Sequence, residues 1–175
     1  GFNAPETHDP FLLFDDFRND TPDAYKNGFP WHPHRGIETI TYVLNGSVKH
    51  NDSLGNSGTL SNGDVQWMTA GSGIMHQEMP TGNARGQMHG FQLWANLPGS
   101  LKMTNPRYQD VQGKEISEVT DDDGTKVKVI TGEFWGKKGP VDGIAADPLY
   151  LDVSIPANLR KSFNVDTYRN TFAYI

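Results

Sequence analysis

Cysteine is missing from this sequence of 175 residues. Disulfide bonds and thiolate ligands are therefore excluded, and any metal ion that the chain binds must be held by nitrogen and oxygen atoms. The absence is compatible with a reducing compartment, and we expect a cytoplasmic location.

Long runs of basic or apolar residues are missing as well. No run of Lys or Arg exceeds two residues, and the net charge is −6, from 15 basic and 21 acidic side chains. Direct, salt-dependent binding of nucleic acid is therefore not expected. No segment approaches the ~18 consecutive apolar residues of a membrane span. No charged head followed by an apolar stretch suggests a signal peptide, and we expect no membrane association.

Helical periodicity is the third feature that the sequence lacks. Apolar residues do not recur at helical spacing over any long stretch, while the chain contains 19 Gly and 11 Pro. Short segments rich in β-branched and aromatic residues alternate with turn signals, which predicts an all-β fold built as a closed barrel or jelly roll. The expected strands are Phe11–Phe14, Ile37–Leu44, Ser47–His50, Thr59-Leu60, Val65–Thr69, Ile74–Met79, Met88–Leu97, Val127–Ile130, Phe134-Trp135, Leu149–Ile155 and Thr171–Ile175.

Turn signals predict how some of these strands pair. Asn45-Gly46 is typical of a type I′ hairpin and predicts that the strands before and after it are hydrogen-bonded to each other. The turn at Ser61–Asp64 predicts a second hairpin in the same way. Residues 99–124 are polar and are interpreted as a connector. The segment Thr39–Val43 is similar to Thr171–Ile175, which would suit two related barrels.

Two pairs of metal-ligand side chains are the most informative feature that is present. In His32-Pro33-His34 and in His76-Gln77-Glu78 the ligand residues stand two positions apart. On a strand such residues point to the same face, so each pair can hold one ion from one wall. Three imidazoles and a carboxylate suit iron, manganese, nickel, cobalt, copper or zinc. The pattern predicts one mononuclear metal centre; the alternative is a solvated Glu78 and a His76 that forms a hydrogen bond within a loop.

The parity of Ile37–Leu44 predicts which way the first histidine pair points. Its even positions carry the bulkier side chains, such as Ile40 and Tyr42. Unless a bulge intervenes, His32 and His34 share this parity, and we expect them to face the same interior.

The remaining histidines are interpreted as structural. His89 shares strand parity with Phe91 and Leu93, which predicts a packed or hydrogen-bonded side chain. His50 ends a predicted strand and is expected to be solvated. Residues 125–175 contain no histidine, so no second metal centre is expected there.

The spacing of glycines and ligands resembles that of the cupin superfamily. Its two motifs correspond here to Gly28, His32, His34, Glu38 and Gly46, and to Gly63, Gly71, Gly73 and His76. The intervals depart from the common cupin pattern, because Gly28 lies close to His32 and because His76 comes late after Gly63. These departures match one branch of the superfamily, the pirin family.

Several longer stretches resemble the pirin family. They are Asp9–Leu13, Gly28–Gly36, Gly63–Gly71, His76–Pro80 and Gln92–Pro98. The resemblance is dense over residues 9–110 and loose over residues 125–175. It implies a bicupin, in which residues 1–110 form an N-terminal metal-binding cupin barrel and residues 111–175 form a connector and an incomplete second barrel. Since pirins are longer at both ends, we expect this chain to be part of a longer protein.

The same resemblance implies a site and an activity. The pirin ligands correspond to His32, His34, His76 and Glu78 and hold one metal ion, usually Fe(II), whereas Glu38 is not a ligand. Pirins similar to this chain open the flavonol quercetin with O2, so we expect a metal-dependent dioxygenase that acts on a small aromatic substrate. Glu78 would be catalytic, as a ligand that also accepts the substrate proton. The alternative is a non-catalytic, iron-dependent regulator that docks on a partner protein, either a transcription factor or a metabolic enzyme.

Overall fold

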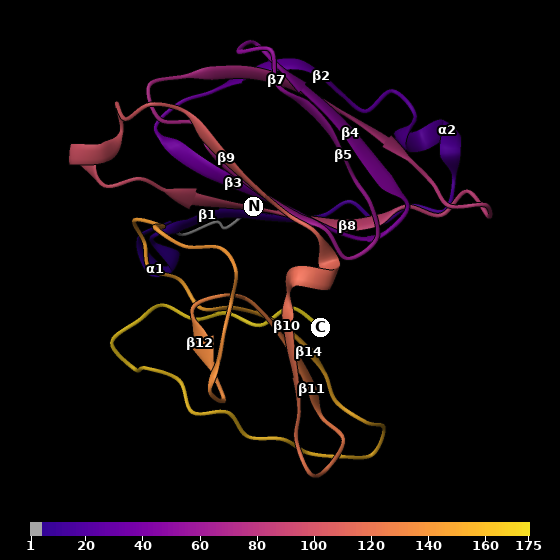
Figure 1. The fold of residues 1–175 in the computed structure, drawn as a ribbon, viewed down its shortest axis with the longest axis vertical. Coiled ribbons are helices and arrows are strands. Elements are labelled where there is room, and N and C mark those ends of the chain that lie inside the picture. Colours follow the sequence, from indigo (N-terminus) through magenta and orange to yellow (C-terminus); the bar gives the residue numbers. More distant parts are fainter. Residues whose placement is uncertain (1–4) are drawn as a thin grey trace.

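Two antiparallel β-sheets face each other over residues 11–111 and form a barrel, in the upper part of Figure 1. The computed structural model describes residues 5–175. One sheet has the order β2-β7-β4-β5, with bounds β2 Phe29–His34, β7 Ile74–Thr81, β4 Ser47–Asp52 and β5 Ser57–Leu60. The other has the order β1-β8-β3-β6-β9, with bounds β1 Phe11–Asp16, β8 His89–Asn96, β3 Ile37–Asn45, β6 Val65–Thr69 and β9 Arg107–Val111. The predicted all-β class is confirmed.

A smaller region occupies the lower part of Figure 1. It contains a sheet of β10 Ser117–Thr120, β11 Lys126–Thr131 and β14 Tyr150–Ser154, and a ribbon of β12 Glu133–Phe134 and β13 Lys137–Lys138. In the described part of the chain, helical structure is limited to α1 Pro5–His8, α2 Pro22–Tyr25 and two 3₁₀ turns, η1 Gly99–Leu101 and η2 Gly113–Glu115. Within residues 5–175, no helix is both long and apolar enough to cross a membrane.

The five-stranded sheet separates two interiors, because successive residues of β3 point to its opposite faces. Ile40 and Tyr42 belong to a hydrophobic core that also contains Ile130 and Val141 of the smaller region. Thr41 points the other way, and its hydroxyl donates a hydrogen bond of 3.1 Å to the Glu78 carboxylate in the four-stranded sheet. The interior of the barrel therefore lies on the face of β3 opposite to its bulkier residues.

The expectation that His32 and His34 share a face with Ile40 and Tyr42 is wrong. Strands β2 and β3 belong to different sheets, and the chain turns between them at Gly36, whose φ of +69° favours glycine. Because of this turn, the inward and outward positions of β2 cannot be counted from those of β3. The histidines point into the barrel, where the His34 ring lies 5.1 Å from the ring of Trp94 on β8.

Both predicted hairpins are wrong as pairings, although both turns exist. Asn45-Gly46 connects β3 to β4, and Ser61–Asp64 connects β5 to β6, but each of these strand pairs is divided between the two sheets. Strand β3 cannot pair with β4, because β8 and β6 already occupy its two edges. The first turn requires glycine, since a Cβ at Gly46 would lie 2.7 Å from the carbonyl oxygen of Thr81. The turns therefore carry the chain from one sheet to the other, as in a jelly roll.

The predicted connector over residues 99–124 contains two strands, β9 and β10. Strand β9 is rich in polar side chains and so does not look like a strand in the sequence. Two of these side chains form hydrogen bonds to the smaller region. Arg107 donates to the carbonyl oxygen of Gly143 over 2.7 Å, and Gln109 donates to that of Asp142 over 2.8 Å.

The predicted strand Thr171–Ile175 is absent. Instead, the rings of Phe172 and Tyr174 lie 5.5 and 5.1 Å from that of Phe14 on β1. The similarity of this segment to Thr39–Val43 therefore has no structural counterpart, since the aromatic side chains pack individually rather than along a strand.

Candidate metal centre

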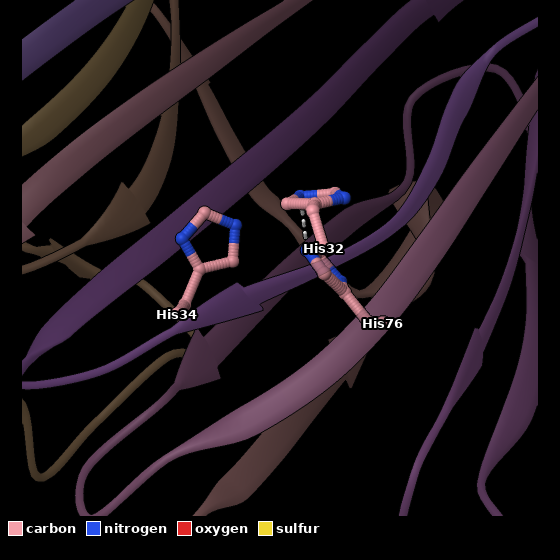
Figure 2. A group of neighbouring side chains, drawn as sticks. All are labelled: His32, His34 and His76. Carbon is pink, nitrogen blue, oxygen red and sulfur yellow. Dashed lines mark hydrogen bonds between the residues drawn. The ribbon is translucent and has the colours of Figure 1, made fainter.

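Three histidines from two adjacent strands converge inside the barrel (Figure 2). Strands β2 and β7 are antiparallel, and His32 lies directly opposite His76. The Nε2 atoms of these two residues are 3.0 Å apart, and the His34 ring lies 4.8 Å from the His32 ring and 4.9 Å from the His76 ring. One ring nitrogen from each histidine lies within 4.8 Å of the others. This arrangement presents three nitrogen donors to one point.

The hydrogen bonds around these rings fit a metal ion. The Nδ1–H of His32 donates to the carbonyl oxygen of Pro30 over 2.7 Å, which leaves the lone pair on Nε2. Among the described residues, Nε2 of His34 is buried without a hydrogen-bond partner. Buried polar atoms rarely lack a partner, and a coordinated ion would provide one. These three residues could therefore hold a transition metal.

Burial keeps two of the imidazoles neutral. Burial, together with a smaller contribution from the nearby His32, lowers the pKa of His34 to about 4. Burial likewise lowers the pKa of His76 to about 3, with the two other histidines adding to the effect. The neutral imidazole is the form that binds metals, so the fold prepares these side chains as ligands at neutral pH.

Glu78 lies on the same face of β7 as His76 and is only 3% exposed. Its carboxylate does not belong to the converging group of donors. It accepts a hydrogen bond from Thr41 Oγ1 at 3.1 Å and two from Gln92 Nε2 at 3.2 and 3.3 Å. Burial raises the pKa of Glu78, while the Gln92 and Thr41 donors oppose that rise. The alternative of a solvated Glu78 and a His76 in a loop is wrong, because both are buried on a strand.

The expectation that His50 is solvated is wrong. His50 is 3% exposed, and Gln66 Nε2 lies 2.8 Å from its Nε2 and donates over 2.9 Å to Asp110. It lies directly opposite Glu78 in the pairing of β4 with β7, and its ring leaves no room for a side chain at Gly58. Burial lowers the pKa of His50, although Asp110 and Asp52 act in the opposite direction. Its alternation with Val48 could have indicated the inward position.

Other side chains singled out in the sequence lie around the barrel or outside it. His89 is partly buried, and its ring lies 5.1 Å from that of Phe91, so the side chain is packed as its strand parity predicted. Glu38 lies on the opposite face of β3 from Thr41 and accepts a hydrogen bond of 2.7 Å from Thr69. Its position is on the far side of the sheet from the three histidines.

The family model and the related proteins that match this chain all indicate one family. The family model described as Pirin matches residues 2–95. A pirin-like protein from Caulobacter vibrioides is 50% identical over 158 residues, which cover 90% of this chain and 57% of that protein. Pirin from Homo sapiens is 44% identical over 167 residues, covering 95% of this chain and 55% of its own length.

A solved structure with a similar fold supports the same family and confirms the cupin-type barrel. The crystal structure of a quercetin 2,3-dioxygenase from Acinetobacter baumannii matches 80% of this chain and 51% of its own, with a TM-score of 0.71 and 39% identity. The chain thus spans only about half the length of the proteins that it resembles.

Proposed function

Because this chain belongs to the pirin family, within the cupin superfamily, we propose that it is the metal-binding part of a dioxygenase that opens flavonols such as quercetin with O2. The observation that carries the proposal is the convergence of three histidines beside a buried carboxylate. The name of the Acinetobacter baumannii neighbour, quercetin 2,3-dioxygenase, supports it. In this proposal residues 1–110 form the metal-binding barrel, and residues 111–175 form a connector and part of a second barrel.

His32, His34 and His76 would hold one divalent transition metal, and Glu78, on the same face of β7 as His76, would turn toward the ion as a fourth ligand when it is bound. Iron is the ion that we propose, with manganese, nickel, cobalt, copper or zinc as substitutes. When bound, such an ion supplies Lewis acidity and a template that brings O2 and a substrate oxygen together.

Glu78 would take the proton from the substrate hydroxyl. Its pKa is raised by burial, so it is a stronger base than an exposed carboxylate would be. Thr41 and Gln92 donate hydrogen bonds to both of its oxygens and so fix the plane of the carboxylate. The barrel around it excludes water, which strengthens these interactions.

The proposal is tested by the oxygen consumption of the iron-loaded protein with quercetin, compared with the same protein after removal of iron by a chelator. We expect O2 uptake and release of carbon monoxide only with iron bound. If the metal-saturated protein is inert toward every flavonol and catechol tried, the dioxygenase proposal fails.

A second candidate is an iron-dependent regulator that docks on a partner protein. It is favoured by exposed apolar side chains on the two strands that carry the histidines and in the turn after β4. Trp31 is 49%, Met75 46% and Leu54 60% exposed. Leu54 follows Ser53, whose amide donates to the carbonyl oxygen of Met75 over 2.8 Å. This role predicts a metal-dependent change in partner binding without substrate turnover.

A further inference from the structure

A small void lies inside the barrel beside Glu78. Its apolar wall is formed by Phe17, Phe29, Val48 and Pro80, and Gln92 shares its polar side with Glu78. The void measures about 10 Å³, which is room for a single water molecule. Pockets for organic ligands measure on the order of hundreds of Å³. An aromatic substrate can therefore reach Glu78 only if one of these side chains moves.

A bulge in β2 is the reason why Phe29 belongs to this wall. In the pairing of β2 with β7, Phe29 lies opposite Glu78 and His32 lies opposite His76, so β2 contains one residue more than β7 over this interval. Phe29 and His32 are three positions apart, so in a regular strand without the bulge they would point to opposite faces. The bulge turns the Phe29 side chain toward the same face as the histidines, a known effect of bulges near functional sites.

Phe29 is also the wall residue that lies between solvent and Glu78. Its side chain is 40% exposed, whereas Glu78 is 3% exposed. It stands on β2, an edge strand that is hydrogen-bonded on one side only. Phe17, by contrast, is fixed against β8, since its ring would lie 2.4 Å from a Cβ at Gly90 and its amide donates to the Gly90 carbonyl over 3.1 Å. Of the two rings, Phe29 is the one free to turn outward.

We propose that Phe29 is the specificity-determining residue of this site, which closes the route to Glu78 and admits planar aromatic substrates with an acidic hydroxyl group when its ring turns outward. The admitted rings would pack against Phe17 and Pro80, and the hydroxyl would face Glu78. The inference rests on the proposed function for the identity of the substrate class, but the closing role of Phe29 can be measured without turnover.

The test is the association rate of ligands with the iron-loaded protein in the absence of O2. Quercetin is the bulky probe and catechol the compact one, each followed by its absorbance change in a stopped-flow instrument. We expect Phe29→Ala to raise the association rate constant of quercetin by about tenfold, because binding then needs no movement of the ring. The catechol rate constant should rise by a smaller factor, because its single ring needs a smaller movement of Phe29. Phe29→Trp should slow quercetin more than catechol.

Trp31→Ala provides the matched control, because Trp31 is an aromatic residue on the same strand that is 49% exposed and does not line the void. It should leave both association rates unchanged, and the iron content of all variants should equal that of wild type. Equal effects of Phe29→Ala and Trp31→Ala, or no binding of quercetin by any variant, would overturn the proposal. Tight quercetin binding without O2 consumption would instead overturn the dioxygenase function and leave the role of Phe29 intact.

Discussion

At the scale of single residues, the site depends on which protons its side chains carry. His32 is held in one tautomer by the carbonyl oxygen of Pro30, 2.7 Å away. His34 and His76 are held neutral by burial, with pKa values of about 4 and about 3. In the metal-free protein these buried imidazoles are neutral and would gain a proton if the chain unfolded, so its stability should depend on pH.

We expect the metal-free protein to lose stability as the pH falls below about 6.5, the ordinary pKa of histidine. Below that value the unfolded chain protonates His34 and His76, whereas the folded chain does not until about pH 4 and about pH 3. The unfolded state then binds more protons, so the free energy of unfolding decreases by about 1.4 kcal/mol per pH unit for each histidine. Urea unfolding between pH 8 and pH 5 measures this slope. His34→Gln should reduce the slope, and an unchanged slope in that variant would contradict the assignment.

Glu78 gives a sharper prediction about the reaction. Glu78→Gln keeps a side chain of similar size but removes the charge and the basicity, so turnover at full metal occupancy should fall by roughly 10²–10⁴-fold. Glu38→Gln is the matched control, because Glu38 is an equally buried carboxylate on the far side of β3. His34→Ala should abolish both metal binding and turnover. A metal-saturated Glu78→Gln protein with wild-type turnover would remove the role of Glu78 as a base.

The sequence could predict the candidate residues but not their surroundings. Residue type and the i, i+2 spacing were sufficient to choose His32, His34 and His76, because strand alternation is a local property. The hydrogen bonds from Thr41 and Gln92 to Glu78 join residues 37 and 14 positions apart in the chain, and no local pattern indicates them. His50 was missed although its alternation with Val48 is local, whereas its partners Gln66 and Asp110 on β6 and β9 could not be read from the sequence.

At the scale of the elements, many of the strands were predictable and their partners were not. A turn such as Asn45-Gly46 fixes a local reversal of the chain, but it does not decide to which sheet the next strand belongs. That choice depends on which edges are already occupied, and β3 has β8 and β6 on its two edges. Strand β9 was missed because its outward side chains bind backbone carbonyls and so are polar.

Close contact between β4 and β5 predicts the effect of one glycine substitution. A Cβ at Gly58 would lie 2.5 Å from Nε2 of the buried His50, so Gly58→Ala should lower the free energy of unfolding by about 1–3 kcal/mol. Gly99→Ala is the control, because nothing lies within 4 Å of its Cβ position, and it should change stability by less than about 0.5 kcal/mol. Chemical denaturation of the metal-free variants compares them. Equal stabilities would show that the His50 ring moves aside at little cost.

At the scale of the whole molecule, the barrel and the smaller region share one hydrophobic core. Ile40 and Trp67 of the five-stranded sheet pack in the same cluster as Ile116 and Ile130. Polar contacts reinforce it, and the hydroxyl of Tyr42 donates to the Asp152 carboxylate on β14 over 2.7 Å. The two regions should therefore unfold together, whereas the functional division at residue 110 stays a prediction.

Tyr42→Phe tests this coupling. Burial raises the pKa of Tyr42, so its hydroxyl stays protonated and acts as a donor. Its removal should lower the free energy of unfolding by about 1 kcal/mol and should speed hydrogen exchange in β14. Tyr168→Phe, at a side chain that is 99% exposed, should change neither. Faster exchange confined to β3 in the Tyr42→Phe variant would contradict the coupling.

The bulge in β2 also bears on how proteins of this kind can diverge. Three positions separate Phe29 from His32, so plain alternation would put the two on opposite faces, and only the bulge puts them on one face. A mutation that let β2 pair with β7 without the bulge would turn Phe29 outward and leave all three histidines in place. Substrate range could thus evolve through the backbone path of one edge strand, while the ligands of the metal are inherited unaltered.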